Sequence, residues 1–341
     1  MKKGIPLVLI GLLIFIVFLY FLSGTAGLAN IATTLERTNL FYYSLAFICT
    51  LLGVLLFSLT WHSLLKLLSI RISFRKTILY ILVGTFVDLL IPAESISGDL
   101  SRVYLMHKNT IEDTGKVVAS IVSHRIISMT TTLVGLIVSS TYFLLRYRPS
   151  ELVVNIIAIV SVGTAISIIA LCYLSARPQT TEKVIDRIIR FVAFVSRGHW
   201  QLTSLRAKVQ KMLTAFHQGI EALSTRPKSL AWPVTFTVAS WFFDLLIPFF
   251  VFVSLGFGVP LSLIVVVYSI SVALQTIPLG IPGEIGLIEI VMTSLYTLLG
   301  IPIAVSAAAT VLVRLVTFWF KLFVGYAAMQ WVGIKTLIGP R

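Results

Sequence analysis

Long hydrophobic runs recur along the chain and predict a helical protein that crosses a membrane several times. A membrane-spanning helix needs about 20 apolar residues. Runs near this length lie at residues 5–22, 40–60, 117–145, 152–174, 232–257 and 303–332. The runs are continuous, whereas the strands of a membrane barrel alternate apolar and polar residues in short segments. We therefore predict an all-α polytopic membrane protein with about six full spans.

Two further apolar segments, 77–109 and 261–299, are interrupted by residues that a straight membrane helix does not accommodate. The first contains Leu90–Met106, LIPAESISGDLSRVYLM, and the second contains Thr276–Glu289, TIPLGIPGEIGLIE. Proline removes a backbone donor and clashes with the preceding turn, and interrupted backbone at membrane depth must be buried in protein or line a wet cavity. We predict a re-entrant or broken helical hairpin in each segment. The alternative is a surface loop between two short spans.

Basic residues predict which side of the membrane each loop faces, because lysine and arginine collect in cytoplasmic loops. Lys2 and Lys3 precede the first run, and segment 61–76 carries four basic residues and no acid. Segment 176–228 carries ten basic residues against three acids. These features predict that both termini and the basic segment are cytoplasmic.

With this topology the two broken segments enter the membrane from opposite sides, which predicts an inverted-topology repeat. The first repeat covers residues 1–145, with two spans, the broken segment 77–109 and a final span. The second covers residues 146–332, and residues 333–341 form a cytoplasmic tail. Interrupted hydrophobic segments at corresponding positions of two halves are the best sequence indication of a transporter's central site.

The basic insert 176–228 within the second repeat has its own helical pattern. Apolar residues recur at helical spacing at Leu205, Val209, Met212, Phe216, Ile220 and Leu223. This stripe fits an amphipathic helix on the membrane surface. A helix packed against the cytoplasmic ends of the spans fits it equally well.

Composition narrows the class of partner. The chain is 57% hydrophobic and 12% charged, with a formal net charge of +14. Basic loops on so apolar a chain suit an anionic leaflet, so we expect membrane lipids and no nucleic acid as partners. Cys49 and Cys172 lie in apolar runs and imply no disulfide or metal framework. The run at 5–22 could be a secretory signal peptide, but its length favours a retained first helix.

Charged and titratable side chains at membrane depth are the candidates for function. A charge at a helix centre costs about 2.5–3.5 kcal/mol on insertion scales, so such a residue usually has a partner or a function. The set comprises Asp88, Glu94, Asp99, Arg102, His124, Arg125, Asp244, Glu284, Glu289, Arg314 and Lys321. The alternative to function is mutual neutralisation, in which acids and arginines pair and lock helices together.

Arg125 and Arg314 are the best candidates for binding an anion, because the planar guanidinium matches a phosphate or carboxylate bidentately. We expect Arg102 and the broken backbone at Gly283 and Gly286 to complete the binding site, since free N–H groups at helix termini also favour anions.

The acids and the histidine have other predicted roles. The carboxylates that would balance the arginines, bind a cationic part of a head group or carry protons are Glu94, Asp99, Glu284 and Glu289. The candidates for a proton or charge relay are His124, Asp244, Asp88 and Lys321. For His124, the alternative is a hydrogen-bonded packing residue.

Catalytic motifs are not evident in the sequence. It contains no Gly-x-Ser-x-Gly elbow, no His-Glu-x-x-His and no P-loop Gly-Lys-Ser/Thr. We therefore expect no catalytic residues, no metal and no cofactor, and we do not expect an enzyme.

The C-terminal third carries the motifs of a known family. Pro282-Gly283-Glu284-Ile285-Gly286-Leu287-Ile288-Glu289 is followed by Gly300-Ile301-Pro302 and then by a helix with Arg314. This order resembles the flippase-like transmembrane domain family and is similar to the membrane region of lysylphosphatidylglycerol synthases, the multiple peptide resistance factors. The upstream family segment resembles Pro92–Arg102 with a longer spacing, and His124-Arg125 stands where the family has Glu-Arg.

The resemblance implies a flippase-like transporter in the cell membrane. We expect it to move an anionic lipid, or a lipid-linked head group such as a polyprenyl phosphate or glycolipid, between leaflets, passively or coupled to an ion. Two alternatives stay open: a membrane enzyme or accessory subunit acting on a polyprenyl-linked substrate, and a transporter of small organic anions. Further expected partners are a second copy of the chain or a lipid-modifying enzyme.

Overall fold

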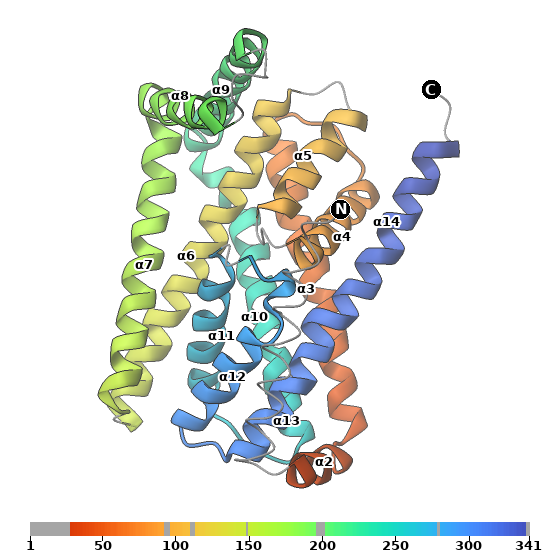
Figure 1. The fold of residues 1–341 in the computed structure, drawn as a ribbon, viewed down its shortest axis with the longest axis vertical. Coiled ribbons are helices and arrows are strands. Elements are labelled where there is room, and N and C mark those ends of the chain that lie inside the picture. The colour runs from red at the N-terminus through yellow and green to blue at the C-terminus, as the bar shows by residue number, and fades with distance from the viewer. Residues whose placement is uncertain are drawn as a thin grey trace.

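All regular elements that the structure describes are helices (Figure 1). This computed structural model describes residues 28–91, 96–109, 113–147, 149–195, 202–277 and 280–338. Five helical stretches in this part are long and apolar enough to cross a membrane: Leu40–Leu67 (α3), Thr114–Tyr147 (α6), Glu151–Ala176 (α7), Pro227–Ser254 (η1 and α10) and Ile303–Gly333 (α13 to α14). They correspond to five of the six predicted spans, and the run at 5–22 lies outside the described residues. The all-α polytopic membrane fold is therefore confirmed.

Both interrupted segments form pairs of shorter helices. The first pair is α4 (Phe74–Leu90) and α5 (Ser97–Asn109), and the second pair is α11 (Leu261–Gln275) and α12 (Leu287–Leu298). Figure 1 shows the first pair toward the end of the bundle that carries α8 (Pro178–Val195) and α9 (Leu202–Ser224). The second pair lies toward the opposite end.

The second break is buried and has an unusual backbone. It contains a short 3₁₀ turn, η2 (Pro282–Glu284), whose Gly283 and Glu284 both adopt positive φ angles, 55° and 49°. Gly286, which precedes α12, has a φ of 88°. A Cβ atom on Gly283 would lie 2.1 Å from the Phe318 ring, so glycine is required there by both conformation and space. Because Gly283 and Glu284 are buried, this break is not a surface loop.

Helices of the two halves pack against each other in a reciprocal pattern. The central pair is α3 and α10, joined by the hydrogen bond from the Ser240 hydroxyl to the Gly53 carbonyl at 3.0 Å. Helix α4 lies against α14 (Lys321–Ile338), the last helix of the second half, and α11 lies against α6, the last helix of the first half. Two halves related by a two-fold axis would give this exchange of partners. The inverted repeat itself stays a prediction.

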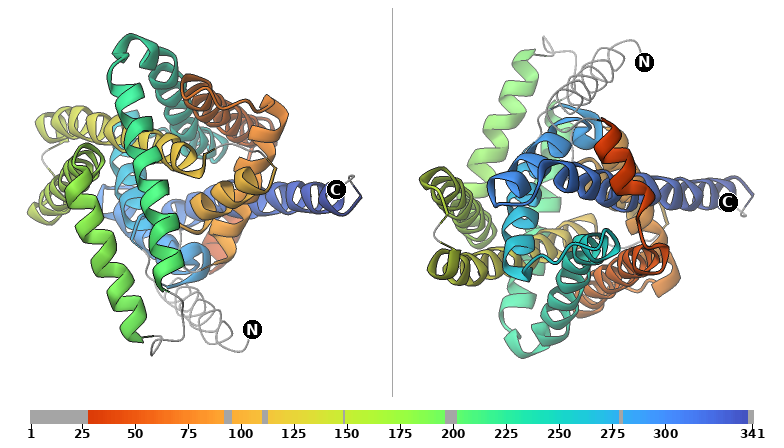
Figure 2. Two further views of the ribbon diagram at one scale, coloured as in Figure 1. Left: turned by 90° about the horizontal axis from the view of Figure 1, so that it is seen from above. Right: turned by 90° about the horizontal axis from the view of Figure 1, so that it is seen from below.

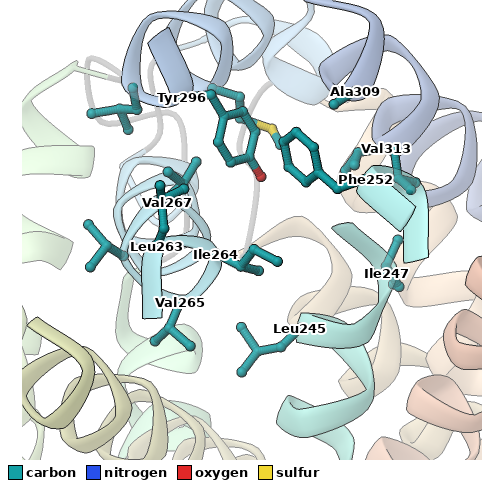
Figure 3. Packing of buried hydrophobic residues seen from close by; sticks show 14 of the residues in the cluster. Leu245, Ile247, Phe252, Leu263, Ile264, Val265, Val267, Tyr296, Ala309 and Val313 are labelled. Carbon is teal, nitrogen blue, oxygen red and sulfur yellow. The ribbon is translucent and has the colours of Figure 1, made fainter. Parts of the chain in front are cut away.

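Each broken segment has its own hydrophobic core. In the core around the second pair, side chains of α10, α11, α12 and α13 (Ile303–Arg314) converge, with Phe252 edge-on to Tyr296 at a centroid distance of 4.9 Å (Figure 3). The core around the first pair gathers Trp61 of α3, Tyr80 of α4 and Met106 of α5. Both breaks are thus held by packed helices on several sides.

The basic insert forms α8 and α9, which lie across one end of the bundle (Figure 2). Phe216 and Leu223 of α9 are buried in the core of the first pair. A Cβ on Gly115 of α6 would lie 2.2 Å from the Met212 carbonyl oxygen, so the two helices approach closely. Of the two arrangements considered for the apolar stripe, the structure has the packed one over Met212–Leu223.

Candidate functional site

A cavity of about 490 Å³, lined by both polar and apolar side chains, lies where α3, α4, α5, α6, α7 and α11 meet. Its lining includes five of the charged or titratable side chains singled out from the sequence: Asp88, Asp99, Arg102, His124 and Arg125. We call it the first cavity. These five side chains, from Asp88 to Arg125, lie up to 37 positions apart and come together because the break between α4 and α5 turns the chain back toward α6.

Asp99 is the centre of the charge arrangement. It lies in the first turn of α5, where the helix dipole favours an acid. Its two oxygens accept from the Nη2 atoms of two arginines: Arg102 on the same helix, and Arg125 on α6 at 2.5 Å. The Asp99 and Arg125 side chains are 18% and 31% exposed, so the pair is accessible from the cavity. One carboxylate therefore faces two guanidinium groups.

The Arg102 guanidinium is held by aromatic rings as well as by Asp99. It lies 5.3 Å from the Trp61 ring centroid and 5.9 Å from that of Phe57. These distances fit cation–π contacts. Arg102 is therefore the fixed cation of the first cavity and Arg125 the more exposed one.

Asp88 has a structural contact that its predicted relay role did not anticipate. Its Oδ1 accepts from the Ser97 hydroxyl at 2.7 Å and from the Gly98 N–H at 2.6 Å. It thus caps the start of α5 from the end of α4 and closes the break between them. Gly98 permits this contact, since a Cβ there would lie 2.2 Å from Asp88 Oδ2.

His124 is buried, at 2% exposure, and its ring packs on Phe57 with centroids 4.1 Å apart. Neither ring nitrogen has a hydrogen-bond partner among the described residues. The Ser269 hydroxyl, from α11 on the facing wall, is likewise buried without one in this part of the chain. A buried polar group left unsatisfied costs about 1–3 kcal/mol. Both residues line the first cavity, so two of its buried polar groups have no hydrogen-bond partner in the described part of the chain.

Arg314 and Glu289 form a separate, closed arrangement at the second break. Arg314 Nε donates to Glu289 Oε1 and its Nη2 donates to the Gly283 carbonyl, both at 2.7 Å. Glu289 Oε2 accepts from the Gly286 N–H at 2.7 Å, and the guanidinium lies 4.8 Å from the Phe318 ring centroid. Both side chains are 7% exposed. This geometry is the mutual neutralisation considered as the alternative to anion binding.

The remaining predicted residues are divided among three places. Asp244 and Lys321, together with Arg314, line a second cavity of about 220 Å³ on another face of α11. Glu284 is buried in the η2 turn, at 1% exposure. Glu94 lies outside the described residues. The described members of the predicted set are therefore divided between two cavities and the second break instead of forming a single central site.

Sequence reasoning missed the hydroxyl-bearing wall of the first cavity. That wall comes from α6, α7 and α11 and includes Ser128, Thr132, Thr164, Ser167, Ser269 and Thr276. The pairs are four, three and seven residues apart, spacings that return to one face of a helix, and this pattern was available in the sequence. Among the described residues, no group of three or more His, Cys, Asp or Glu side chains is placed to hold a metal ion.

Comparison with known proteins identifies the family. Residues 8–325 match the family described as the lysylphosphatidylglycerol synthase TM region. A membrane protein of Pyrococcus horikoshii, UPF0104 membrane protein PH1989, is 25% identical over 302 residues, covering 88% of this chain and 90% of the relative. UPF0104 membrane protein MJ1595 of Methanocaldococcus jannaschii is 26% identical over 310 residues, covering 89% and 88%. A UPF0104 membrane protein of Methanothermobacter thermautotrophicus is 24% identical over 316 residues, covering 90% of each chain. The chain belongs to the lysylphosphatidylglycerol synthase TM region family.

Proposed function

We propose that this member of the family moves a lipid with an anionic head group between the leaflets of the cell membrane. The lipid is an anionic phospholipid or a lipid-linked phosphate such as a polyprenyl phosphate or glycolipid. The protein acts as a transporter and not as an enzyme, and movement is passive or coupled to an ion. The basic end with α8 and α9 faces the cytoplasm, with both termini on that side.

The observation that carries the proposal is the sharing of Asp99 between Arg102 and Arg125 in the first cavity. Asp88 lines the same cavity and accepts hydrogen bonds from Ser97 and Gly98 at the start of α5. A phosphate suits the two guanidinium groups, because guanidinium groups bind phosphate oxygens with strong, charge-assisted hydrogen bonds.

The walls of the first cavity suit a head group attached to acyl chains. Opposite the arginines, α7 contributes Val160 and Leu171 beside its hydroxyl groups. Helix α7 is the least buried of the five described spans, and Ile159 and Ile166 on its outer side are exposed. The cavity is thus one helix away from lipid, and we propose that the head group enters past α7 while its acyl chains stay in the bilayer.

The test is native mass spectrometry of the purified protein in mild detergent, reading which lipids stay bound. The variant is Arg125→Ala, and the matched control is Arg146→Ala, an exposed arginine on the same helix. We expect a phosphate-bearing lipid to be retained by the wild type and the control and lost in Arg125→Ala. Loss of a charge-assisted hydrogen bond, about 1.5–3 kcal/mol, corresponds to roughly a tenfold or greater drop in retention.

Movement is then measured in proteoliposomes, as the rate at which a fluorescent analogue of the retained lipid reaches the opposite leaflet. We expect Arg125→Ala to slow this movement to the protein-free rate, and Arg146→Ala to leave it unchanged. Equal retention and equal movement in both variants would contradict the proposal. Retention of a small organic anion with no lipid would instead favour the small-solute alternative.

A further inference from the structure

The second cavity contains a group of ionisable side chains that the proposed lipid site does not use. Asp244 of α10, Tyr268 of α11 and Lys321, the first residue of α14, all line it. Lys321 and Asp244 form no direct ion pair in the described part of the chain. An acid, a phenol and an amine thus share one cavity.

Asp244 is held in place from the other side by α3. A Cβ atom on Gly53 would lie only 3.2 Å from Asp244 Oδ1, so the carboxylate rests against the α3 backbone. The other ionisable groups that face it or its cavity come from every element packed around it: Cys49 on α3, Tyr268 on α11, Tyr296 on α12, Arg314 on α13 and Lys321 on α14. Arg314 is already neutralised by Glu289. Lys321 is therefore the cation that balances Asp244.

The backbone before Lys321 departs from a regular helix. Residues Leu315–Phe320 form a π-helical turn, η3, between α13 and α14. Such turns are rare and occur frequently at functional sites. This one separates Arg314, locked to the second break, from Lys321, which has no ion pair among the described residues.

A single helix separates the second cavity from the first. Ser269, Ala273 and Thr276 of α11 line the first cavity, whereas Tyr268, Ser271 and Gln275 line the second. Val272 lines both. A charge added to one cavity therefore changes the electrostatic potential in the other, because only α11, which ends at the second break, lies between them.

We propose that the second cavity is a proton-binding site in which Asp244 takes up one proton from water and Lys321 is its counter-charge. The proton bonds to a carboxylate oxygen, the carboxylate becomes a neutral carboxylic acid, and the Lys321 ammonium is left without its balancing charge. An anion in the first cavity compensates that excess positive charge across α11. Proton uptake and anion binding thus favour each other reciprocally, which makes proton–anion symport the coupling mode. The coupling rests on the proposed lipid function, whereas the proton site does not.

The proton site is tested without any lipid substrate. Infrared difference spectra are recorded on the protein in nanodiscs of zwitterionic lipid while the pH is lowered from about 8 to about 5. We expect a protonated-carboxyl band that is absent in Asp244→Asn and retained in the control Glu221→Gln, an exposed acid on α9. In Lys321→Gln the band is expected at higher pH, because the ammonium no longer favours the charged carboxylate.

Two results would overturn the proton site: no carboxyl band in the wild type, or a band that survives in Asp244→Asn. If Asp244→Asn does not fold, the Lys321→Gln variant provides the test. A carboxyl band that appears at the same pH in Lys321→Gln as in the wild type would then contradict the proposal. The coupling is tested in proteoliposomes with a gradient of one pH unit, which can drive at most about tenfold lipid asymmetry for one proton per lipid. Asp244→Asn should retain lipid in mass spectrometry yet lose this asymmetry. A carboxyl band without lipid retention would refute the lipid function and leave the proton site standing.

Discussion

The two broken segments use the same pair of residue types in different ways. In each, the third residue of the returning helix is an acid, Asp99 in α5 and Glu289 in α12. Each acid pairs with an arginine of the next long helix, 26 and 25 residues further on: Arg125 and Arg314. The correspondence is what the predicted repeat implies. The difference lies in what surrounds each pair.

At the second break, the described partners of the acid and the arginine, besides each other, belong to the break itself and to the start of α12. Glu289 binds Arg314 and the start of its own helix, and Arg314 also binds the Gly283 carbonyl. At the first break, Asp99 is divided between Arg125 and Arg102, and the group opens onto a cavity. The same acid–arginine pair therefore forms a closed structural ion pair, which we call a lock, in the second half. Under our proposal it forms a ligand site in the first half. Predictions that distinguish a structural lock from a ligand site test this comparison.

Arg314→Ala has the largest expected effect on stability. The change leaves Glu289 charged and buried and removes the donor to the Gly283 carbonyl. Breaking a buried pair on one side costs about 3–5 kcal/mol, so we expect a large drop in the thermal unfolding midpoint in detergent, measured by tryptophan fluorescence. In a matched double change, Arg314→Met with Glu289→Gln, much of the stability should return. A folded Arg314→Ala protein that fails only in lipid retention would instead return Arg314 to the ligand role.

Gly283→Ala tests the backbone of the same lock. The alanine Cβ would meet the Phe318 ring, and a non-glycine residue at a φ of 55° adds strain of about 1–3 kcal/mol. We expect a drop in unfolding midpoint that is smaller than for Arg314→Ala. Gly300→Ala is the control, because its φ is 93° but a Cβ there meets nothing within 4 Å. Equal losses in the two variants would show that the contact with Phe318 contributes nothing.

Arg125→Ala should affect stability much less than Arg314→Ala. The Arg125 and Asp99 side chains are partly exposed, and an ion pair of that kind contributes about 1 kcal/mol or less. Asp99 also retains Arg102. We expect an unfolding midpoint close to that of the wild type, alongside the loss of lipid retention described above. A collapse in stability comparable to that of Arg314→Ala would make both breaks locks.

The fold could be predicted further than the site, and particular residues show why. Runs of apolar residues and the prolines at 92, 278 and 282 depend only on local sequence, and they located the described spans and both breaks. The partner of each charge depends on packing across the bundle. Nothing near Asp88 in the sequence indicates that it accepts a hydrogen bond from the Gly98 N–H at the start of the next helix. Nothing near Arg314 indicates that its Nη2 donates a hydrogen bond to the Gly283 carbonyl. The pairing of Asp99 with Arg125 and of Glu289 with Arg314 was not predicted, although the two acids and the two arginines occupy matching positions in the two halves.

A further test is Arg102→Met, which makes the first break resemble the second. Asp99 would then face Arg125 alone, as Glu289 faces Arg314, and the methionine would keep apolar contact with Phe57 and Trp61. One of the two guanidinium groups that bind Asp99 would be lost, so an anionic lipid should be retained less even though Arg125 is intact. Arg102→Lys keeps the charge and should retain more lipid than Arg102→Met, because a lysine still neutralises a phosphate as a point charge. Thermal unfolding and native mass spectrometry of the two variants give the comparison directly. If Arg102→Met retains the lipid as well as the wild type does, the presence of Arg102 does not explain why the first break binds a ligand and the second does not. The greater exposure of the Asp99–Arg125 pair must then explain that difference.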